Sequence, residues 1–171
     1  MGLLHRHDAP PARRFQMHEK LLAIGDDYWI EDEGGAKVYT VTGKVARVRD
    51  TWELEDVNGT NVARIQEKKL TVRDKIAIEL ASGVEASVKK ALVGIRERFV
   101  IDVEGGDDLK AHGNIVDHEY EIERDGDKVA EVSKKWFRLR DTYGVEIEAG
   151  VDPVLILAIT VAIDAMAHDP G

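Results

Sequence analysis

The sequence of 171 residues contains no cysteine. This absence excludes disulfides, thiolate metal sites, cysteine nucleophiles and S-acylation. A chain without thiols is suited to a reducing compartment, and we therefore expect a cytoplasmic protein.

Positive charge is also scarce, because 24 Lys and Arg residues face 33 Asp and Glu residues and the formal net charge is -9. General nucleic-acid binding requires a basic surface that neutralises phosphates, so we expect no nucleic-acid partner. The N-terminal residues lack a long apolar run before a small-residue cleavage site. Neither a secretory signal nor a membrane anchor is visible, and we expect no transmembrane segment.

The common catalytic motifs are missing as well. The chain has no Gly-x-Ser-x-Gly elbow, Walker loop, dinucleotide fingerprint or His-Glu-x-x-His helix. We therefore expect a protein that is not an enzyme and that needs no cofactor.

One apolar segment, residues 152–168, predicts a helix near the end of the chain. Asp152 suits the N-cap and Pro153 the first helical position. Between Val154 and Ile163 only Thr160 is polar, so every face of this helix is apolar. Such a helix is enclosed rather than laid on a surface. At about 1.5 Å per residue it spans roughly 24 Å and contains Asp164, so a surrounding protein wall is favoured over lipid.

The residues before this helix alternate in polarity in short runs separated by turn pairs such as Asn58-Gly59 and Asp125-Gly126. This pattern is typical of β-hairpins with one apolar face, and about twelve strands are expected. A strand of seven or eight residues is about 25 Å long, close to the expected length of the helix. The strands therefore predict a closed antiparallel barrel around the helix, which would also remove exposed strand edges.

The sequence repeats itself. Residues 58–74 (NGTNVARIQEKKLTVRD) align without gaps on residues 125–141 (DGDKVAEVSKKWFRLRD), and residues 27–35 resemble residues 99–106. The barrel is therefore expected to consist of two related halves of about 70 residues, in which Arg73 corresponds to Arg140.

Three blocks carry a resemblance to a known family: residues 25–33 (GDDYWIEDE), 113–122 (GNIVDHEYEI) and 132–145 (VSKKWFRLRDTYGV). They resemble the LURP-one-related family, which belongs with the tubby C-terminal domains and phospholipid scramblases. The resemblance covers residues 17 to 168 and implies a closed barrel of twelve strands threaded by the C-terminal helix. We expect a flexible tail at residues 1–16 and a single mainly β domain at residues 17–169.

Cations occur at corresponding points of the repeat, and phosphate oxygens are bound well by Lys and Arg. By resemblance, tubby domains bind phosphoinositides through an exterior basic surface. The candidate residues for lipid or phosphate binding are Lys68, Lys69, Arg73, Lys134, Lys135, Arg138 and Arg140. The alternative is that these side chains form ordinary solvated strand faces, paired with the abundant carboxylates.

Three further groups invite a functional interpretation. Asp102, Glu104, Asp107 and Asp108 could bind calcium, although their spacing does not match the twelve-residue calcium loop and a hairpin turn is favoured. His112, His118 and Asp117 could form a metal set, although simple polar lining is favoured. Asp164 and His168 lie four residues apart and predict a structural pair at the end of the helix.

These observations favour a non-enzymatic binding or adaptor domain that contacts an anionic membrane surface peripherally through its basic clusters. One alternative is a small-molecule-binding protein or enzyme with a pocket at the barrel mouth near His112 and His118. Another is a scaffold whose partner is a protein. The sequence predicts no metal site and no oligomeric state.

Overall fold

The computed structural model describes residues 12–18, 28–46, 49–68, 75–93, 96–137 and 142–167. Within these residues the chain forms twelve strands and one helix. The elements are β1 (Arg13–His18), β2 (Tyr28–Asp32), β3 (Lys37–Ala46), β4 (Arg49–Asp56), β5 (Asn61–Lys68), β6 (Lys75–Leu80), β7 (Glu85–Val93), β8 (Arg96–Val103), β9 (Leu109–Asn114), β10 (Glu119–Arg124), β11 (Asp127–Ser133), β12 (Thr142–Ile147) and α1 (Pro153–Ala167).

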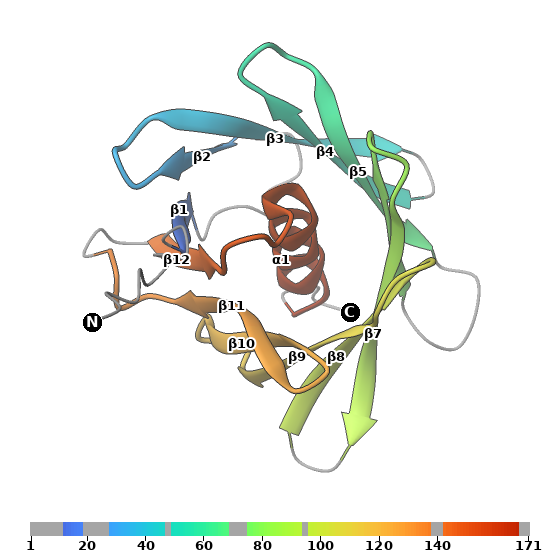
Figure 1. The fold of residues 1–171 in the computed structure, drawn as a ribbon. Coiled ribbons are helices and arrows are strands. Elements are labelled where there is room, and N and C mark those ends of the chain that lie inside the picture. Colours follow the sequence, from blue (N-terminus) through green and yellow to red (C-terminus); the bar gives the residue numbers. More distant parts are fainter. Residues whose placement is uncertain are drawn as a thin grey trace, which may run out of the picture.

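The strands close into one antiparallel barrel (Figure 1). Every strand pairs with its neighbours in sequence, and β1 pairs with β12 from Arg13↔Ile147 to His18↔Thr142. Closure leaves no free sheet edge, which explains how a chain rich in short amphipathic strands avoids edge-to-edge association. The predicted fold is confirmed.

The two ends of the barrel differ. At one end, which we call the turn end, tight connections join β2 to β3 and β4 to β5. In both, an aspartate that ends the first strand accepts two backbone N–H bonds: Asp32 from Gly34 and Ala36, and Asp56 from Asn58 and Thr60. Because all neighbours are antiparallel, the odd-numbered strands all run from the turn end to the opposite end, which we call the far end.

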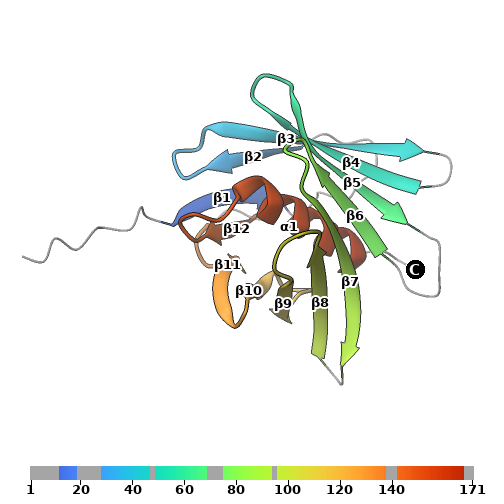
Figure 2. The same ribbon diagram turned by 45° about the vertical axis from the view of Figure 1, so that its right-hand side comes forward.

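Helix α1 lies inside the barrel and runs along it (Figures 1 and 2). The Asp152 carboxylate accepts the N–H of Val154 at 3.0 Å, as expected for an N-cap. All residues from Leu155 to Ala165 are buried, and the helix packs against β5, β6, β7 and β12. The central, wholly enclosed helix predicted from the sequence is confirmed.

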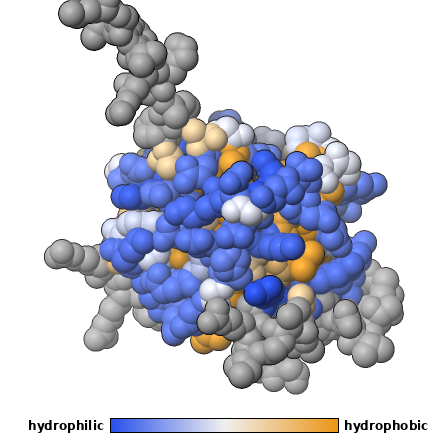
Figure 3. Space-filling model, turned by 60° about the horizontal axis from the view of Figure 1, so that its bottom comes forward, coloured by the Kyte–Doolittle hydropathy of each residue, from blue (hydrophilic) through white to orange (hydrophobic). Residues whose placement is uncertain are grey.

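The wall of the barrel alternates between inward apolar and outward polar side chains. On β6, for example, Ile76, Ile78 and Leu80 are buried and contribute to the core around α1. The outer face seen in Figure 3 is mostly hydrophilic, with isolated hydrophobic spots. In the part of the chain that the structure describes, no helix has the length and apolar character needed to cross a bilayer.

The sequence repeat corresponds to positions in the barrel. Ala63 and Ile65 of β5 are buried, and so are Ala130 and Val132, their counterparts on β11. Strands β5 and β11 are six places apart in a barrel of twelve, as are β2 and β8, which carry the shorter repeat. This spacing is the one expected for two six-stranded halves. The equivalence of Arg73 and Arg140 stays a prediction, because both lie outside the described residues.

The predicted boundary between tail and domain is wrong by a few residues. Residues 13–16, assigned to the tail, belong to β1, where Phe15 is buried in the core and the outward Gln16 is also buried. Two arginines precede the short apolar–polar alternation of this strand, so the sequence alone did not indicate a strand there. Its pairing with β12 shows that it is one.

Candidate functional site

Lysines converge where β5, β6 and β7 lie side by side. Lys68, the last residue of β5, pairs with Lys75, the first residue of β6, and Lys75 pairs with Lys89 on β7. All three belong to the outward set, because Ile65, Ile76 and Val88 on the same strands are buried. Like charges directly opposite each other destabilise a sheet, so this row of lysines is unfavourable for folding alone.

One of these lysines has a carboxylate partner. Lys89 Nζ lies 3.2 Å from Asp102 Oδ2 on β8, and both side chains are nearly half exposed. An exposed pair of this kind contributes at most about 1 kcal/mol and exchanges readily with another anion. The row therefore remains accessible to a ligand.

A hollow of about 410 Å³ lies beside this row, on the side toward the turn end. Its small floor residues include Ala77 and Ser87, and its lining includes the carboxylates of Glu85 and Glu104. A hydrogen bond with Glu104, and the negative charge of that residue, raise the pKa of Glu85 above its ordinary value.

Lys134 and Lys135 follow β11 and are exposed. Lys135 Nζ is 2.7 Å from Glu131 Oε1 and 5.1 Å from the centre of the Trp136 ring. Arg14 Cζ also lies 5.1 Å from the centre of that ring. Trp136 and Phe137 cover the outer surface of β12 at Gly144. An indole beside cations at a protein surface suits the interface between water and a polar headgroup layer.

The structure brings the two lysine groups to one end of the barrel but not to one patch. Because β5 and β11 run in the same direction, Lys68 and Lys134 both lie at the far end. Twelve tilted strands spaced about 4.8 Å apart give a barrel roughly 20 to 25 Å across, so the groups face away from each other on opposite walls. The other predicted cations, Lys69, Arg73, Arg138 and Arg140, lie outside the described residues.

The possible metal set of His112, His118 and Asp117, which the sequence disfavoured, is not formed. His112 is on β9 with its side chain on the outer surface, 41% exposed, and His118 is buried inside the barrel. Asp117 accepts a hydrogen bond from the Asn114 side chain instead. The sequence suggested a hairpin that sets the two histidines on neighbouring strands. In the structure His118 belongs to the four-residue turn 115–118, and the two imidazoles lie on opposite sides of the wall. A barrel-mouth pocket lined by both histidines is therefore not formed.

The buried His118 belongs to a polar cluster around α1. His118 Nε2 lies 3.3 Å from Asp164 Oδ1, the Tyr143 hydroxyl donates to Asp164 Oδ2, and the His118 and Tyr143 rings stack with centroids 4.1 Å apart. His118 has φ of 54°, an uncommon value that tertiary contacts must hold. The predicted partner of Asp164, His168, lies outside the described residues; the contacts described for Asp164 come from the barrel wall.

Tyr120 and Thr160 lie beside this cluster. Burial raises the pKa of Tyr120 well above its ordinary value, the charge of Asp164 raises it further, and the nearby Thr160 hydroxyl opposes both effects. The Thr160 hydroxyl donates to the Ile156 carbonyl at 2.9 Å. Because Thr160 and Asp164 are one turn apart, the cluster fixes one face of the helix against β10 and β12.

The acidic residues between β8 and β9 lie in a hairpin turn, the arrangement that the sequence favoured over a calcium site. Asp102 pairs with Lys89, and Asp108 accepts the backbone N–H of Val103 at 3.4 Å. The first contact joins β8 to β7, and the second closes the connection between β8 and β9.

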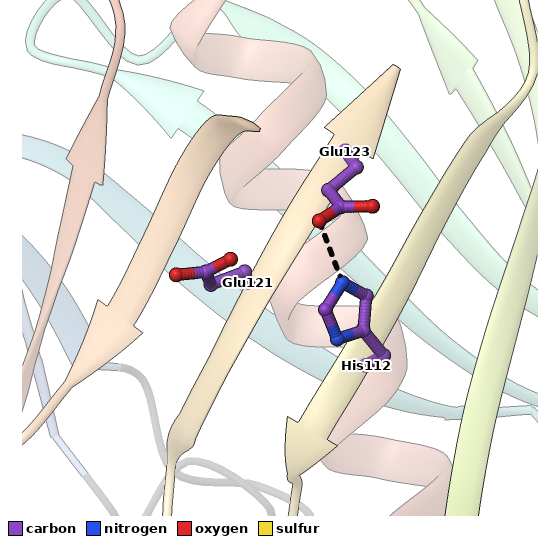
Figure 4. Close-up of side chains that lie close together, drawn as sticks. All are labelled: His112, Glu121 and Glu123. Atoms are coloured by element: carbon purple, nitrogen blue, oxygen red, sulfur yellow. Dashed lines mark ion pairs between the residues drawn. The ribbon is translucent and has the colours of Figure 1, made fainter. Parts of the chain in front are cut away.

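A third group of side chains was missed by sequence reasoning. His112 on β9 pairs in register with Glu121 on β10, and Glu123 lies two residues further along β10 on the same outer face (Figure 4). The candidate ligand atoms of these three residues lie within 4.8 Å of one another. The sequence does contain the signal, an alternating Glu-x-Glu on a strand, but only the register places a histidine opposite it.

Comparison with known proteins agrees with this geometry. The sequence profile described as LURP-one-related matches residues 13–164. The chain belongs to the LURP-one-related family. A solved X-ray structure of an Arabidopsis thaliana protein is similar to this LURP-one-related domain with a TM-score of 0.65 and 16% identity, over 92% of this chain and 93% of that chain. No match is found among curated proteins.

At 16% identity, the similarity of the two structures supports the fold alone. The LURP-one-related match and the barrel filled by its own helix support a binding or adaptor role for the domain. Helix α1 and the core side chains occupy the interior of the barrel.

Proposed function

We propose that this domain is a non-enzymatic binding module that touches an anionic phospholipid surface with the far end of its barrel. The contact residues are the far-end lysines, defined as Lys68, Lys75 and Lys134. The Lys135 ammonium is turned back along the wall to Glu131 of β11 and is not counted among them. The observation that carries the proposal is the parallel course of β5 and β11, which delivers lysines from both halves of the repeat to the same end.

A flat surface can meet both lysine groups although they lie on opposite walls. A small soluble ligand would reach only one group, because the walls are roughly 20 Å apart. Each cation near an anionic leaflet contributes about 1 kcal/mol, so three lysines together suffice for measurable binding and one or two do not. End-on contact with a membrane therefore fits the arrangement better than a pocket does.

The net charge of -9 opposes this contact only at long range. Glu79 on β6 is four residues from Lys75 along the strand, a separation of about 13 Å toward the turn end. The Debye length at physiological salt is about 8 Å, so carboxylates toward the turn end are largely screened from a surface at the far end. At the far end itself, Glu119 accepts the backbone N–H of Lys134 at 3.0 Å, so we expect the binding to be weak.

Vesicle co-sedimentation tests the proposal. The protein is mixed with vesicles of phosphatidylcholine alone or with added phosphatidylserine, at low and at high salt. We expect binding only to the vesicles that contain phosphatidylserine, and release at high salt because exposed charges are screened.

A matched pair of variants locates the contact. Changing Lys68, Lys75 and Lys134 to Gln should abolish binding. The control removes three cations from the turn end, by changing Arg13, Lys37 and Arg124 to Gln, and should bind like the unchanged protein. Equal loss in both variants, or no binding at low salt, contradicts the proposal and favours a protein partner.

A further inference from the structure

The outer face of β9 and β10 carries the His112, Glu121 and Glu123 group, which the lipid proposal does not use. All three side chains start from paired strands, with Glu121 directly opposite His112 and Glu123 opposite Lys110. A ladder of backbone hydrogen bonds fixes the relative positions of their Cα atoms. The group is therefore held by rigid elements rather than by a loop.

The chemistry of the group is that of a transition-metal site. One imidazole and two carboxylates supply three ligands, and their candidate atoms lie within 4.8 Å of one another. Around a tetrahedral Zn²⁺ with bonds of about 2.1 Å, ligand atoms are separated by about 3.4 Å. His112 Nε2 and Glu123 Oε1 are now 2.8 Å apart and need to separate slightly, and the flexible Glu121 side chain needs to move inward.

The histidine distinguishes this group from ordinary acidic clusters. Carboxylates alone favour calcium or magnesium, but an imidazole favours zinc and its first-row neighbours. The Glu121 carboxylate adds a second negative charge beside the His112–Glu123 contact, which favours a cation there. All three side chains are partly exposed, so an ion can enter without opening the barrel.

The surroundings leave room for further ligands. A hollow of about 390 Å³ shares His112 and Glu123 in its lining and also includes Arg98 and Lys110. Arg98 on β8 is the register partner of His112 on the other side. A metal ion held by three protein ligands keeps an open coordination position, and these two cations would favour a small anion such as phosphate or a carboxylate in it.

We propose that His112, Glu121 and Glu123 bind one divalent transition-metal ion, of the zinc class, on the outer wall of the barrel. The site is on β9 and β10, so it is independent of the far-end lysines. Fixed strand register supplies the geometry, and the neighbouring hollow supplies the place for an anionic co-ligand.

Calorimetric titration of the full chain with Zn²⁺ alone tests this site. We expect one ion per chain, and a rise in thermal midpoint on adding zinc because the ion binds the folded state. His112→Ala, Glu121→Gln and Glu123→Gln should each weaken zinc binding by more than about 100-fold, since changes of residues that merely orient a ligand already cost 10- to 100-fold.

Two controls make the result specific. Glu85→Gln removes a carboxylate from the acidic pair on another wall and should leave the affinity unchanged. His5→Ala with His7→Ala removes the two imidazoles near the N-terminus and should also leave it unchanged. Zinc binding that survives His112→Ala but disappears with the His5 and His7 changes overturns the proposal, as does the absence of saturable binding.

Discussion

His112 and His118 are close in sequence, but the wall of the barrel separates them. Each lies beside a carboxylate: His112 Nε2 is 2.8 Å from Glu123, and His118 Nε2 is 3.3 Å from Asp164. The side chain of His112 is 41% exposed, and that of His118 is 5% exposed. A histidine beside a carboxylate therefore occurs in two different environments, although both histidines belong to one hairpin.

The difference teaches what burial does to a polar pair. Inside, His118 and Asp164 have lost water, so removing one partner leaves the other in an apolar core at a cost of several kcal/mol. Outside, water competes for His112 and Glu123, and their pairing contributes about 0 to 1 kcal/mol. The inner pair stabilises the position of the helix. In the outer pair, either residue can exchange its partner for a ligand at little cost.

The largest expected effect tests whether the interior tolerates charge without a partner. Leu157→Asp places a carboxylate at a fully buried helix position and should abolish soluble folding, because the cost of several kcal/mol approaches a total stability of roughly 5 to 15. Circular dichroism and gel filtration measure it. Leu157→Met conserves volume and should cost less than about 1.5 kcal/mol. A monodisperse, cooperatively unfolding Leu157→Asp protein would show that α1 is not enclosed.

The next effect concerns the inner pair itself. Asp164→Ala removes the acceptor of the Tyr143 hydroxyl and the neighbour of His118, and should lower the free energy of unfolding by about 3 to 5 kcal/mol in urea titrations. Asp164→Asn keeps the volume and one acceptor oxygen and should cost less. Equal stability of the Ala variant and the unchanged protein would mean that the inner cluster contributes nothing to the fold.

A smaller effect is expected at Gly144, where the outside of the wall is covered. A Cβ there would lie 2.7 Å from ring atoms of both Trp136 and Phe137, so Gly144→Ala must displace them and should cost about 1 to 3 kcal/mol. The matched control is Gly43→Ala, whose Cβ would meet Trp52 at an ordinary 3.6 Å. If the two variants unfold at the same urea concentration, the covering of β12 is loose.

The smallest effect is expected for the outer histidine. His112→Ala without added metal should change the free energy of unfolding by no more than about 0.5 kcal/mol, because a half-exposed pair contributes little. Thermal unfolding in the presence of a chelator measures this. A loss comparable to that of Asp164→Ala would remove the contrast between the two sides of the wall.

The barrel and its helix were predictable because each follows from a local pattern. Alternating polarity with turn glycines specifies strands with one apolar face, and the segment from Val154 to Ile163 specifies an enclosed helix. The repeat correctly indicated that β5 and β11 are corresponding strands. The start of β1 was missed because two arginines mask the alternation of Phe15 and Met17.

The candidate sites depended on distances that no local pattern contains. The sequence placed Lys68 and Lys134 in corresponding halves of the repeat. That they lie at the same end of the barrel but on opposite walls follows from the direction of the strands in the closed barrel. It also suggested His112 and His118 as neighbours, because it does not reveal which way the turn 115–118 redirects the chain.

By itself, then, the sequence determined the fold class and the enclosed helix, since the polarity period acts residue by residue. Only the tertiary structure decided which side of the wall each polar group occupies and which groups meet across strands. Register is the physical reason, because a shift of one residue in pairing turns every side chain to the opposite face. His112 thereby meets Glu121 outside the barrel, and Asp164 meets His118 within it.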